Sequence, residues 1–137
     1  MNASELIHGG LYLIHDTNDV VVRYDIISNS FRSEWYEYPL APFCDDVCAT
    51  DGDRFIFVKP IPLTEVILNA NGFEKHGYWI KYIGDEEIDV CISHDIPSYY
   101  YGKPWNFCFP HANYVHQLQL ALCLLCLNDL AENFKIK

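Results

Sequence analysis

The stretch KPIPLTEVILNANGF, residues 59–73, predicts a short helix whose two ends are both defined. Thr64 can cap this helix, because its hydroxyl accepts a hydrogen bond from a backbone N–H two or three residues further on. Leu63 before the cap and Leu68 inside the helix are spaced for a hydrophobic staple. Gly72 can adopt the left-handed conformation that ends a helix, and the phenylalanine after it can pack back. The stretch is therefore explained as a structural element without chemistry of its own.

A second segment, YVHQLQ at residues 114–119, opens a longer helix that we expect over residues 113–127. Its apolar residues recur at the spacing of a core-facing stripe, which comprises Val115, Leu118, Leu122 and Leu125. Further leucines and cysteines extend the apolar surface round the other side. Such a helix is buried, or it presents a face to a partner.

The first sixty residues have the pattern of short strands separated by turns. Branched and aromatic residues favour strands, and clusters of Asn, Asp, Ser and Gly mark the turns between them. The expected strands cover residues 10–14, 20–27, 31–38 and 54–58. Short strands at a spacing of roughly ten residues are typical of a small curled sheet or barrel.

The second half of the chain is predicted to contain a β-hairpin between the two helices. Its strands cover residues 78–83 and 88–92, and a turn at residues 84–87 joins them. Residues 93–113 form the longest irregular stretch, and long loops in compact domains are often functional. The tail, residues 134–137, has the composition of an edge strand.

The segment at residues 59–73 and the YVHQLQ segment together resemble a group of small uncharacterised proteins from bacteriophages and mobile elements of gut bacteria. Members of that group carry a PIPLT…NGF segment in mid-chain and YVHQLQ near the C-terminus. The opening SELIHGGLY, residues 4–12, is similar to the group's N-terminal pattern, with Gly9-Gly10 where the group has Gly-Asn. The resemblance implies an SH3-like β-barrel and a phage or mobile-element setting, and it implies no reaction.

These observations predict one α+β domain over residues 1–137. Residues 1–60 are its strand-rich half, for which the resemblance implies an SH3-like barrel. Residues 61–137 contain the short helix, the β-hairpin and a buried C-terminal helix.

The chain is strongly acidic, with nineteen acidic residues, nine basic residues and a formal net charge of −10 at pH 7. An anionic surface repels phosphate backbones, so direct nucleic-acid binding is disfavoured. The charge either keeps the protein soluble or attracts a basic patch on a partner, for example by mimicking nucleic acid. No signal-peptide pattern opens the sequence, and no apolar stretch reaches the roughly 18 residues of a membrane span. We therefore expect a cytoplasmic protein of the host cell that does not bind membranes.

Two cysteine pairs, Cys44 with Cys48 and Cys123 with Cys126, invite a zinc interpretation. Structural zinc usually takes four Cys or His ligands on tight knuckles. The first pair lacks a second pair to complete such a site, and the second lies inside an apolar helix, where packing is the simpler explanation. We expect reduced thiols and no metal or other cofactor.

None of the six histidines forms a local metal motif. For His116, in the YVHQLQ segment, a structural role in bonding a neighbouring backbone is favoured over catalysis. His94-Asp95 has the arrangement that orients an imidazole for base catalysis, but no nucleophile motif accompanies it. No catalytic residue is predicted.

The richest recognition candidate is an aromatic run inside the long irregular stretch, and its residues are Tyr99, Tyr100, Tyr101, Lys103 and Trp105. The acidic residues Asp85, Glu86 and Glu87 of the hairpin, followed by Asp89, are expected to lie beside it. Tyr and Trp suit protein interfaces, while aromatic rings with a lysine also suit a nucleotide. Three interpretations remain: rings that cover the core, a protein interface, or a small-molecule pocket.

Our first hypothesis is a non-enzymatic accessory protein of a phage or mobile element that docks on a host or defence-system protein, as an acidic inhibitor. It would act as a monomer or small homo-oligomer. The alternative is a protein that sequesters a nucleotide signal between aromatic rings and its few basic residues. A small hydrolase or zinc protein comes last. The net charge favours the first hypothesis over the second, because nucleotides are anions.

Overall fold

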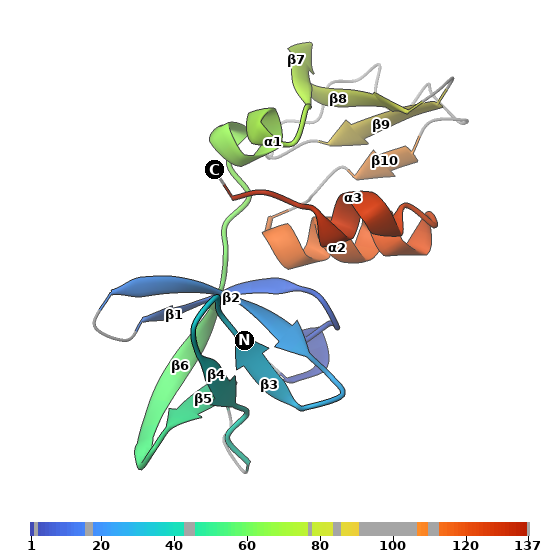
Figure 1. The fold of residues 1–137 in the computed structure, drawn as a ribbon. Coiled ribbons are helices and arrows are strands. Elements are labelled where there is room, and N and C mark those ends of the chain that lie inside the picture. The colour runs from blue at the N-terminus through green and yellow to red at the C-terminus, as the bar shows by residue number, and fades with distance from the viewer. Residues whose placement is uncertain are drawn as a thin grey trace.

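The computed structural model describes residues 1, 3–15, 18–42, 46–76, 78–83, 86–90, 107–109 and 113–136. The chain has the predicted α+β fold, with a strand-rich N-terminal half and a C-terminal half of a second sheet and helices (Figure 1). The N-terminal half comprises the 3-10 helix η1 (Ala3–Glu5) and strands β1 (Leu11–His15), β2 (Asp19–Asp25), β3 (Ser30–Arg32), β4 (Glu37–Pro39), β5 (Cys48–Asp51) and β6 (Arg54–Pro60). The C-terminal half comprises α1 (Glu65–Ala70), β7 (Glu74–His76), β8 (Tyr78–Ile83), β9 (Glu86–Val90), β10 (Phe107–Phe109), α2 (Val115–Leu124) and α3 (Asn128–Glu132).

The N-terminal half is a six-stranded antiparallel sheet that is nearly closed into a barrel. Its strand order is β4-β3-β2-β1-β6-β5. The two edge strands meet, because Ala41 N donates to Cys48 O at 2.9 Å and Leu40 pairs with Ala49 in an isolated bridge. Closure of this kind protects strand edges from pairing with other chains. The prediction of a barrel-like N-terminal half is confirmed.

Strand β1 belongs to both hydrophobic cores of the molecule. Tyr12 and Ile14 point into the barrel, where each is 0% exposed. Leu11 and Leu13 lie on the opposite face of the strand and pack into the core of the C-terminal half. Because successive side chains of a strand point to opposite faces, this one strand connects the two cores.

The C-terminal half packs its helices against a sheet with the order β10-β9-β8-β7. Strand β10 runs parallel to β9, and the other neighbours are antiparallel. Figure 1 shows α2 and α3 between this sheet and the barrel. Val115, Leu118 and Leu122 of α2 share a core with Ile88 and Val90 of β9. Burial of this stripe contributes more to the helix than its intrinsic propensity does.

The ends of α1 match those expected from the sequence. The Thr64 hydroxyl accepts a hydrogen bond from Ile67 N at 3.3 Å. Gly72 has a φ of +84°, and Phe73 N donates to Leu68 O at 3.1 Å, which completes the C-terminal capping motif. Phe73 and Leu68 are both buried in the core of the C-terminal half.

Two strand predictions differ from the structure. Residues 31–38 do not form one strand, because the chain turns between β3 and β4, where Ser33 N donates to Tyr36 O at 2.8 Å. The tail at residues 134–136 is not a strand, although Phe134 is buried in the core. Strands β5, β7 and β10, each of three or four residues, were not predicted because they are too short for a periodic pattern.

The C-terminal helix is shorter than predicted and only one of its faces is buried. Helix α2 ends at Leu124, and a left-handed residue, Cys126 with a φ of 63°, turns the chain into the unpredicted helix α3. Leu118 and Leu122 lie in the core as expected, whereas Leu125 is half-buried and Leu124 is exposed. Among the described helices, none combines the length and the apolar character that a membrane crossing requires.

Candidate functional site

The aromatic run predicted to carry recognition, residues 99–105, lies outside the described residues, and so does Asp85. Glu86 and Glu87 lie at the start of β9, paired with Ile83 and Tyr82 of β8. The following acidic residue, Asp89, is fully buried, which corrects its expected place on an acidic surface. The described part of the chain offers three other places for function: the joint between the two halves, a cavity, and an aromatic surface on the barrel.

The two motif segments pair directly with each other at the joint. Val115 N donates to Ile61 O at 2.9 Å, and Leu63 N donates to Asn113 O at 2.9 Å. Between these bonds, Pro62 and Tyr114 form an antiparallel bridge. The prolines before α1 therefore present an extended backbone to which the start of α2 is fixed.

Gln119 connects α2 to the barrel and to α3. Its Oε1 accepts a hydrogen bond from Leu11 N at 2.9 Å. Its Nε2 donates to Ala131 O at 3.1 Å and to Gly9 O at 3.3 Å. The side chain is 1% exposed, so these bonds satisfy an amide that would be costly to bury alone. The final residue of YVHQLQ thus has a structural explanation.

His116 lies between two tyrosine rings in the same joint. Its ring stacks on Tyr114 with centroids 5.9 Å apart, and contacts Tyr12 with centroids 5.2 Å apart. Nε2 lies 3.9 Å from the carboxylate of Glu5, and Nδ1 has no hydrogen-bond partner among the described residues. The side chain is 3% exposed. Burial lowers the pKa of His116, and the Glu5 charge acts in the opposite direction. This environment favours a neutral, packed imidazole.

Tyr12, the other buried titratable group of the joint, is held by two hydrogen bonds. Its hydroxyl donates to Glu5 O at 3.0 Å and accepts from Ile7 N at 3.0 Å. Burial raises the pKa of Tyr12 to about 12, so the phenol stays protonated near neutral pH. It therefore serves as a structural contact that holds η1 against the barrel.

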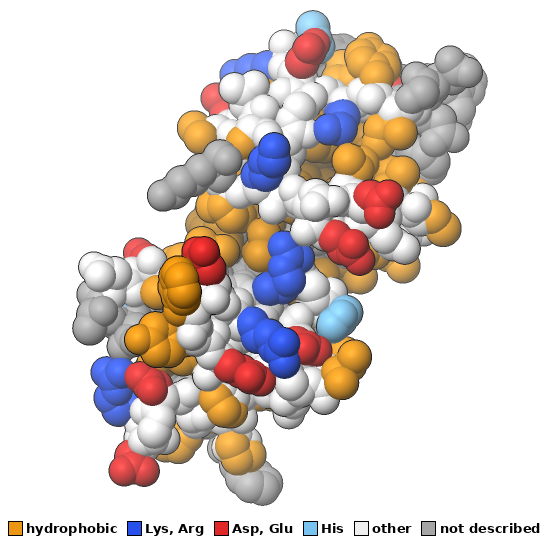
Figure 2. All heavy atoms as spheres, viewed as in Figure 1, with side chains coloured by type: hydrophobic (Ala, Val, Ile, Leu, Met, Phe, Trp, Pro, Cys, Tyr) orange, Lys and Arg blue, Asp and Glu red, His pale blue; other side chains and the backbone are white. Residues whose placement is uncertain are grey.

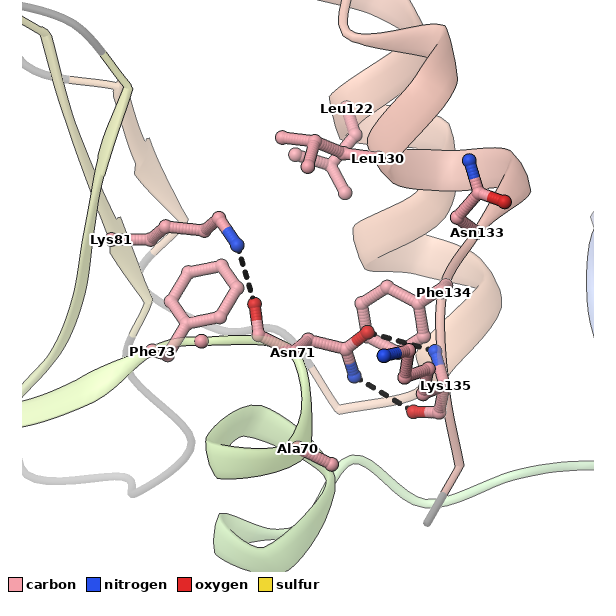
Figure 3. Close-up of a pocket in the computed structure, with 10 residues that line it drawn as sticks. Ala70, Asn71, Phe73, Lys81, Leu122, Leu130, Asn133, Phe134 and Lys135 are labelled. Carbon is pink, nitrogen blue, oxygen red and sulfur yellow. Dashed lines mark hydrogen bonds between the residues drawn. The ribbon is translucent and has the colours of Figure 1, made fainter.

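A second place is a cavity of about 330 Å³ in the C-terminal half, here called the NGF cavity after the Asn71-Gly72-Phe73 turn that forms one wall (Figure 3). The described residues that line it are Ala70, Asn71, Gly72, Phe73, Lys81, Leu122, Leu130, Asn133, Phe134 and Lys135. The Asn71 side chain holds the C-terminal tail by two bonds to the Lys135 backbone, each 2.7 Å. The mid-chain motif therefore builds both the helix cap and this wall.

A larger hollow of about 670 Å³ lies at the waist between the two halves, and it contains Arg23 and Arg32. Arg23 donates to Gly9 O at 2.8 Å and to Glu132 O at 3.0 Å. The Arg32 guanidinium forms ion pairs with the carboxylates of Asp25, from Nε to Oδ2 at 3.5 Å, and Glu37, from Nη2 to Oε1 at 3.7 Å. Both guanidinium groups are engaged by the protein itself, which favours a structural role for this hollow.

The third place is a surface of exposed aromatic rings on the barrel, here called the barrel-end surface. Its rings are Trp35, 82% exposed, Tyr36, 68%, Phe55, 65%, and Phe57, 61%. In β6, Ile56 and Val58 fill the barrel, so the alternating phenylalanines point outward. Figure 2 shows hydrophobic side chains on the strand-rich half with acidic and basic side chains among them.

Two ion pairs join the parts of the barrel-end surface. Trp35 and Tyr36 line one hollow together with Asp19 and Asp51. Phe55 and Phe57 line a second hollow together with His15, Arg54 and Lys59. His15 Nδ1 lies 2.7 Å from Asp19, and Arg54 lies 2.7 Å from Asp51, so each pair bridges the two hollows. The four rings therefore line two hollows that these ion pairs connect.

The sequence contains a signal for the barrel-end surface in the predicted strand at residues 54–58. Residues 54–58 were read correctly as a strand, yet the run Arg-Phe-Ile-Phe-Val offers an apolar residue to both faces. Trp35 belongs to residues 31–38, which were predicted as one strand, but it lies between β3 and β4. An apolar residue on both faces of a strand in a half-exposed sheet is the pattern that indicates such a surface.

The cysteines provide no metal centre in the part of the chain that the structure describes, where no group of three or more potential ligands occurs. Cys48 is buried. Cys123 and Cys126 are exposed and form no disulfide, so their interpretation as packing residues is wrong. Cys44 lies outside the described residues.

Comparison with known proteins gives no match among family models, curated proteins or solved structures.

Proposed function

We propose that this chain is a binding protein of a phage or mobile element that docks on a host or defence protein through the barrel-end surface. The observation that carries the proposal is the exposure of Trp35, Tyr36, Phe55 and Phe57 around two hollows that ion pairs connect. Removing a large apolar ring from water is favourable, so exposed rings gain free energy when a partner covers them. Contiguous exposed apolar patches therefore mark interaction sites. Tryptophan and tyrosine are also the residues that most often anchor protein interfaces.

The charges around these rings support a protein partner. The barrel-end surface combines the cations of Arg54 and Lys59 with the carboxylates of Asp19, Glu34 and Asp51. A mixed rim around aromatic anchors is the usual anatomy of a protein interface. The net charge of −10 then contributes at longer range, by drawing the chain towards a basic partner.

The proposal is tested with variants of the rings and a matched control. Tagged wild type, Trp35→Ser, Phe57→Ser and Ile27→Ser are used to capture proteins from cells that naturally carry the gene. Ile27 is a suitable control because it is exposed on the same half of the molecule but lies outside the barrel-end surface. The captured partner is then purified and titrated against each variant.

We expect each ring variant to weaken binding by on the order of 1–3 kcal/mol, mostly through faster dissociation, while Ile27→Ser binds as wild type does. Equal affinity for folded Trp35→Ser, Phe57→Ser and wild type would refute docking at this surface. Tyr100→Ala and Trp105→Ala are run beside them, because the aromatic run of residues 99–105 is the site expected from the sequence. Loss of binding in those variants alone would move the interface there.

A further inference from the structure

We propose that the NGF cavity binds a small organic anion, with a carboxylate or phosphate head and a short apolar or single-ring body. The described lining contains two lysines, Lys81 and Lys135, and no acidic residue. This composition is unusual for a chain in which nineteen acidic residues oppose nine basic ones. The described lining of the cavity is thus positively charged, whereas the chain as a whole is negatively charged.

The ammonium group of Lys81 is fixed at the wall of the cavity. Its Nζ donates to Asn71 O at 2.6 Å and lies 5.9 Å from the centroid of the Phe73 ring. An ammonium group has three N–H donors, and the bond to Asn71 uses one of them. The position of Nζ also depends on Gly72, since a Cβ there would come within 2.8 Å of it. The glycine therefore allows both the helix cap and the place of the charge.

Lys135 brings the second charge to the same cavity. Its backbone is fixed by two hydrogen bonds with the Asn71 side chain, one accepted by Lys135 O and one donated by Lys135 N, and its own side chain is exposed. Figure 3 shows Lys81 and Lys135 on either side of Asn71, with Phe73 and Phe134 among the lining side chains. An anion between the two lysines would gain charge-assisted hydrogen bonds, which are stronger than neutral ones.

The remaining walls suit an apolar body. Phe73, Leu122 and Phe134 are buried core residues that also line the cavity, and Leu130 packs against the same core. The volume of about 330 Å³ is at the lower end of the range for ligand pockets, roughly 300–1,000 Å³. A body of one ring fits this size better than a dinucleotide does.

The test uses benzoate and phenyl phosphate as probes, with benzyl alcohol as a neutral probe of similar shape. Each probe is titrated into the full chain while the amide resonances of Gly72, Phe73 and Lys135 are followed by NMR. The benzoate and phenyl phosphate titrations distinguish a carboxylate site from a phosphate site. Lys81→Gln removes the fixed charge, and Lys59→Gln on the barrel is the matched control, since Lys59 lines a different hollow.

We expect at least one anion to shift these three resonances saturably, and benzyl alcohol to bind with an affinity at least about tenfold lower. Lys81→Gln should lower the affinity for the anion about tenfold, which corresponds to about 1.4 kcal/mol, and Lys59→Gln should leave this affinity unchanged. If Lys81→Gln does not fold, Lys135→Gln takes its place, because that side chain is exposed. The proposal is overturned if neither anion gives a saturable shift at these residues. It is also overturned if benzyl alcohol binds wild type as tightly as the anion does, or if the folded lysine variant binds the anion as tightly as wild type does.

Discussion

His116 is a titratable side chain that the fold holds between Tyr12 and Tyr114, close to Glu5. Burial lowers the pKa of His116 below its usual value of about 6.5. As pH falls, the unfolded chain therefore takes up this proton before the folded chain does. The contribution of His116 to stability is fully present above about pH 6.5 and is lost as pH falls towards the pKa of the folded state.

We predict that the free energy of unfolding decreases between about pH 7 and pH 5, and that His116→Phe removes part of this decrease. A phenyl ring preserves the packing between the two tyrosines but does not titrate. Urea denaturation at several pH values measures the slope, and His76→Phe serves as control because His76 is exposed. An identical pH slope in wild type and His116→Phe would show that the buried imidazole is not linked to stability.

Single residues with a backbone requirement were predicted well from the sequence. Gly72 and Thr64 were assigned to the ends of α1, and the structure places both there. Such residues are recognisable because a positive φ or a side-chain cap restricts the choice of amino acid. The left-handed conformation of Cys126 was not predicted, because glycine and asparagine usually indicate such a position and cysteine does not.

At the scale of the element, α2 and α1 end in the same way with different residues. In α2, Leu127 N donates to Leu122 O at 2.9 Å and Cys126 N to Cys123 O at 3.0 Å. In α1 the left-handed position is Gly72, whereas in α2 it is Cys126, with a φ of 63°. A side chain in the left-handed conformation costs roughly 1–2 kcal/mol, so the end of α2 carries local strain.

We predict that Cys126→Gly increases the free energy of unfolding by about 0.5–1 kcal/mol. Relief of the left-handed strain exceeds the entropy that glycine adds to the unfolded chain, which is roughly 0.4–1 kcal/mol. Chemical denaturation under reducing conditions measures the change. Gly72→Ala is the opposite control and should destabilise, because it adds a Cβ at a φ of +84°. A destabilised Cys126→Gly variant would contradict this account of the helix end.

Elements with a long periodic pattern were predicted, and short ones were not. Strands β1, β2, β6 and β8 and the start of α2 lie where alternation or helical spacing indicated them. Strands β5 and β7 are held by pairing with β6 and β8, which local sequence does not reveal. The break between β3 and β4 was missed because residues 31–38 contain no Gly or Pro before Pro39, so no turn residue of that kind marks the break.

At the scale of the whole molecule, three separate segments build one joint. Residues around Gly9 and Leu11, the stretch at residues 59–73 and the YVHQLQ segment meet through backbone bonds and Gln119. The last two segments were linked from the sequence only because both belong to the resemblance described above, which gave no physical reason for the link. Their pairing accounts for both motifs structurally, and function is then assigned to the barrel-end surface and the NGF cavity. Neither site was predicted, because each depends on which side chains the packing leaves exposed.

We predict that this joint makes the two halves unfold as one cooperative unit, and hydrogen exchange in increasing urea tests this most directly. Amides of Val22 and Phe31 report on the barrel, and those of Ile80 and Leu118 report on the C-terminal half. In wild type we expect all four to lose protection at one urea midpoint. Gln119→Met keeps the shape of the side chain but leaves Leu11 N without its acceptor. It also removes one donor each from Gly9 O and Ala131 O, which still accept from Arg23 and Phe134 N. This variant should lower the midpoint of both halves, by roughly 1–3 kcal/mol. Separate midpoints for the barrel and the C-terminal half in wild type would contradict the claim.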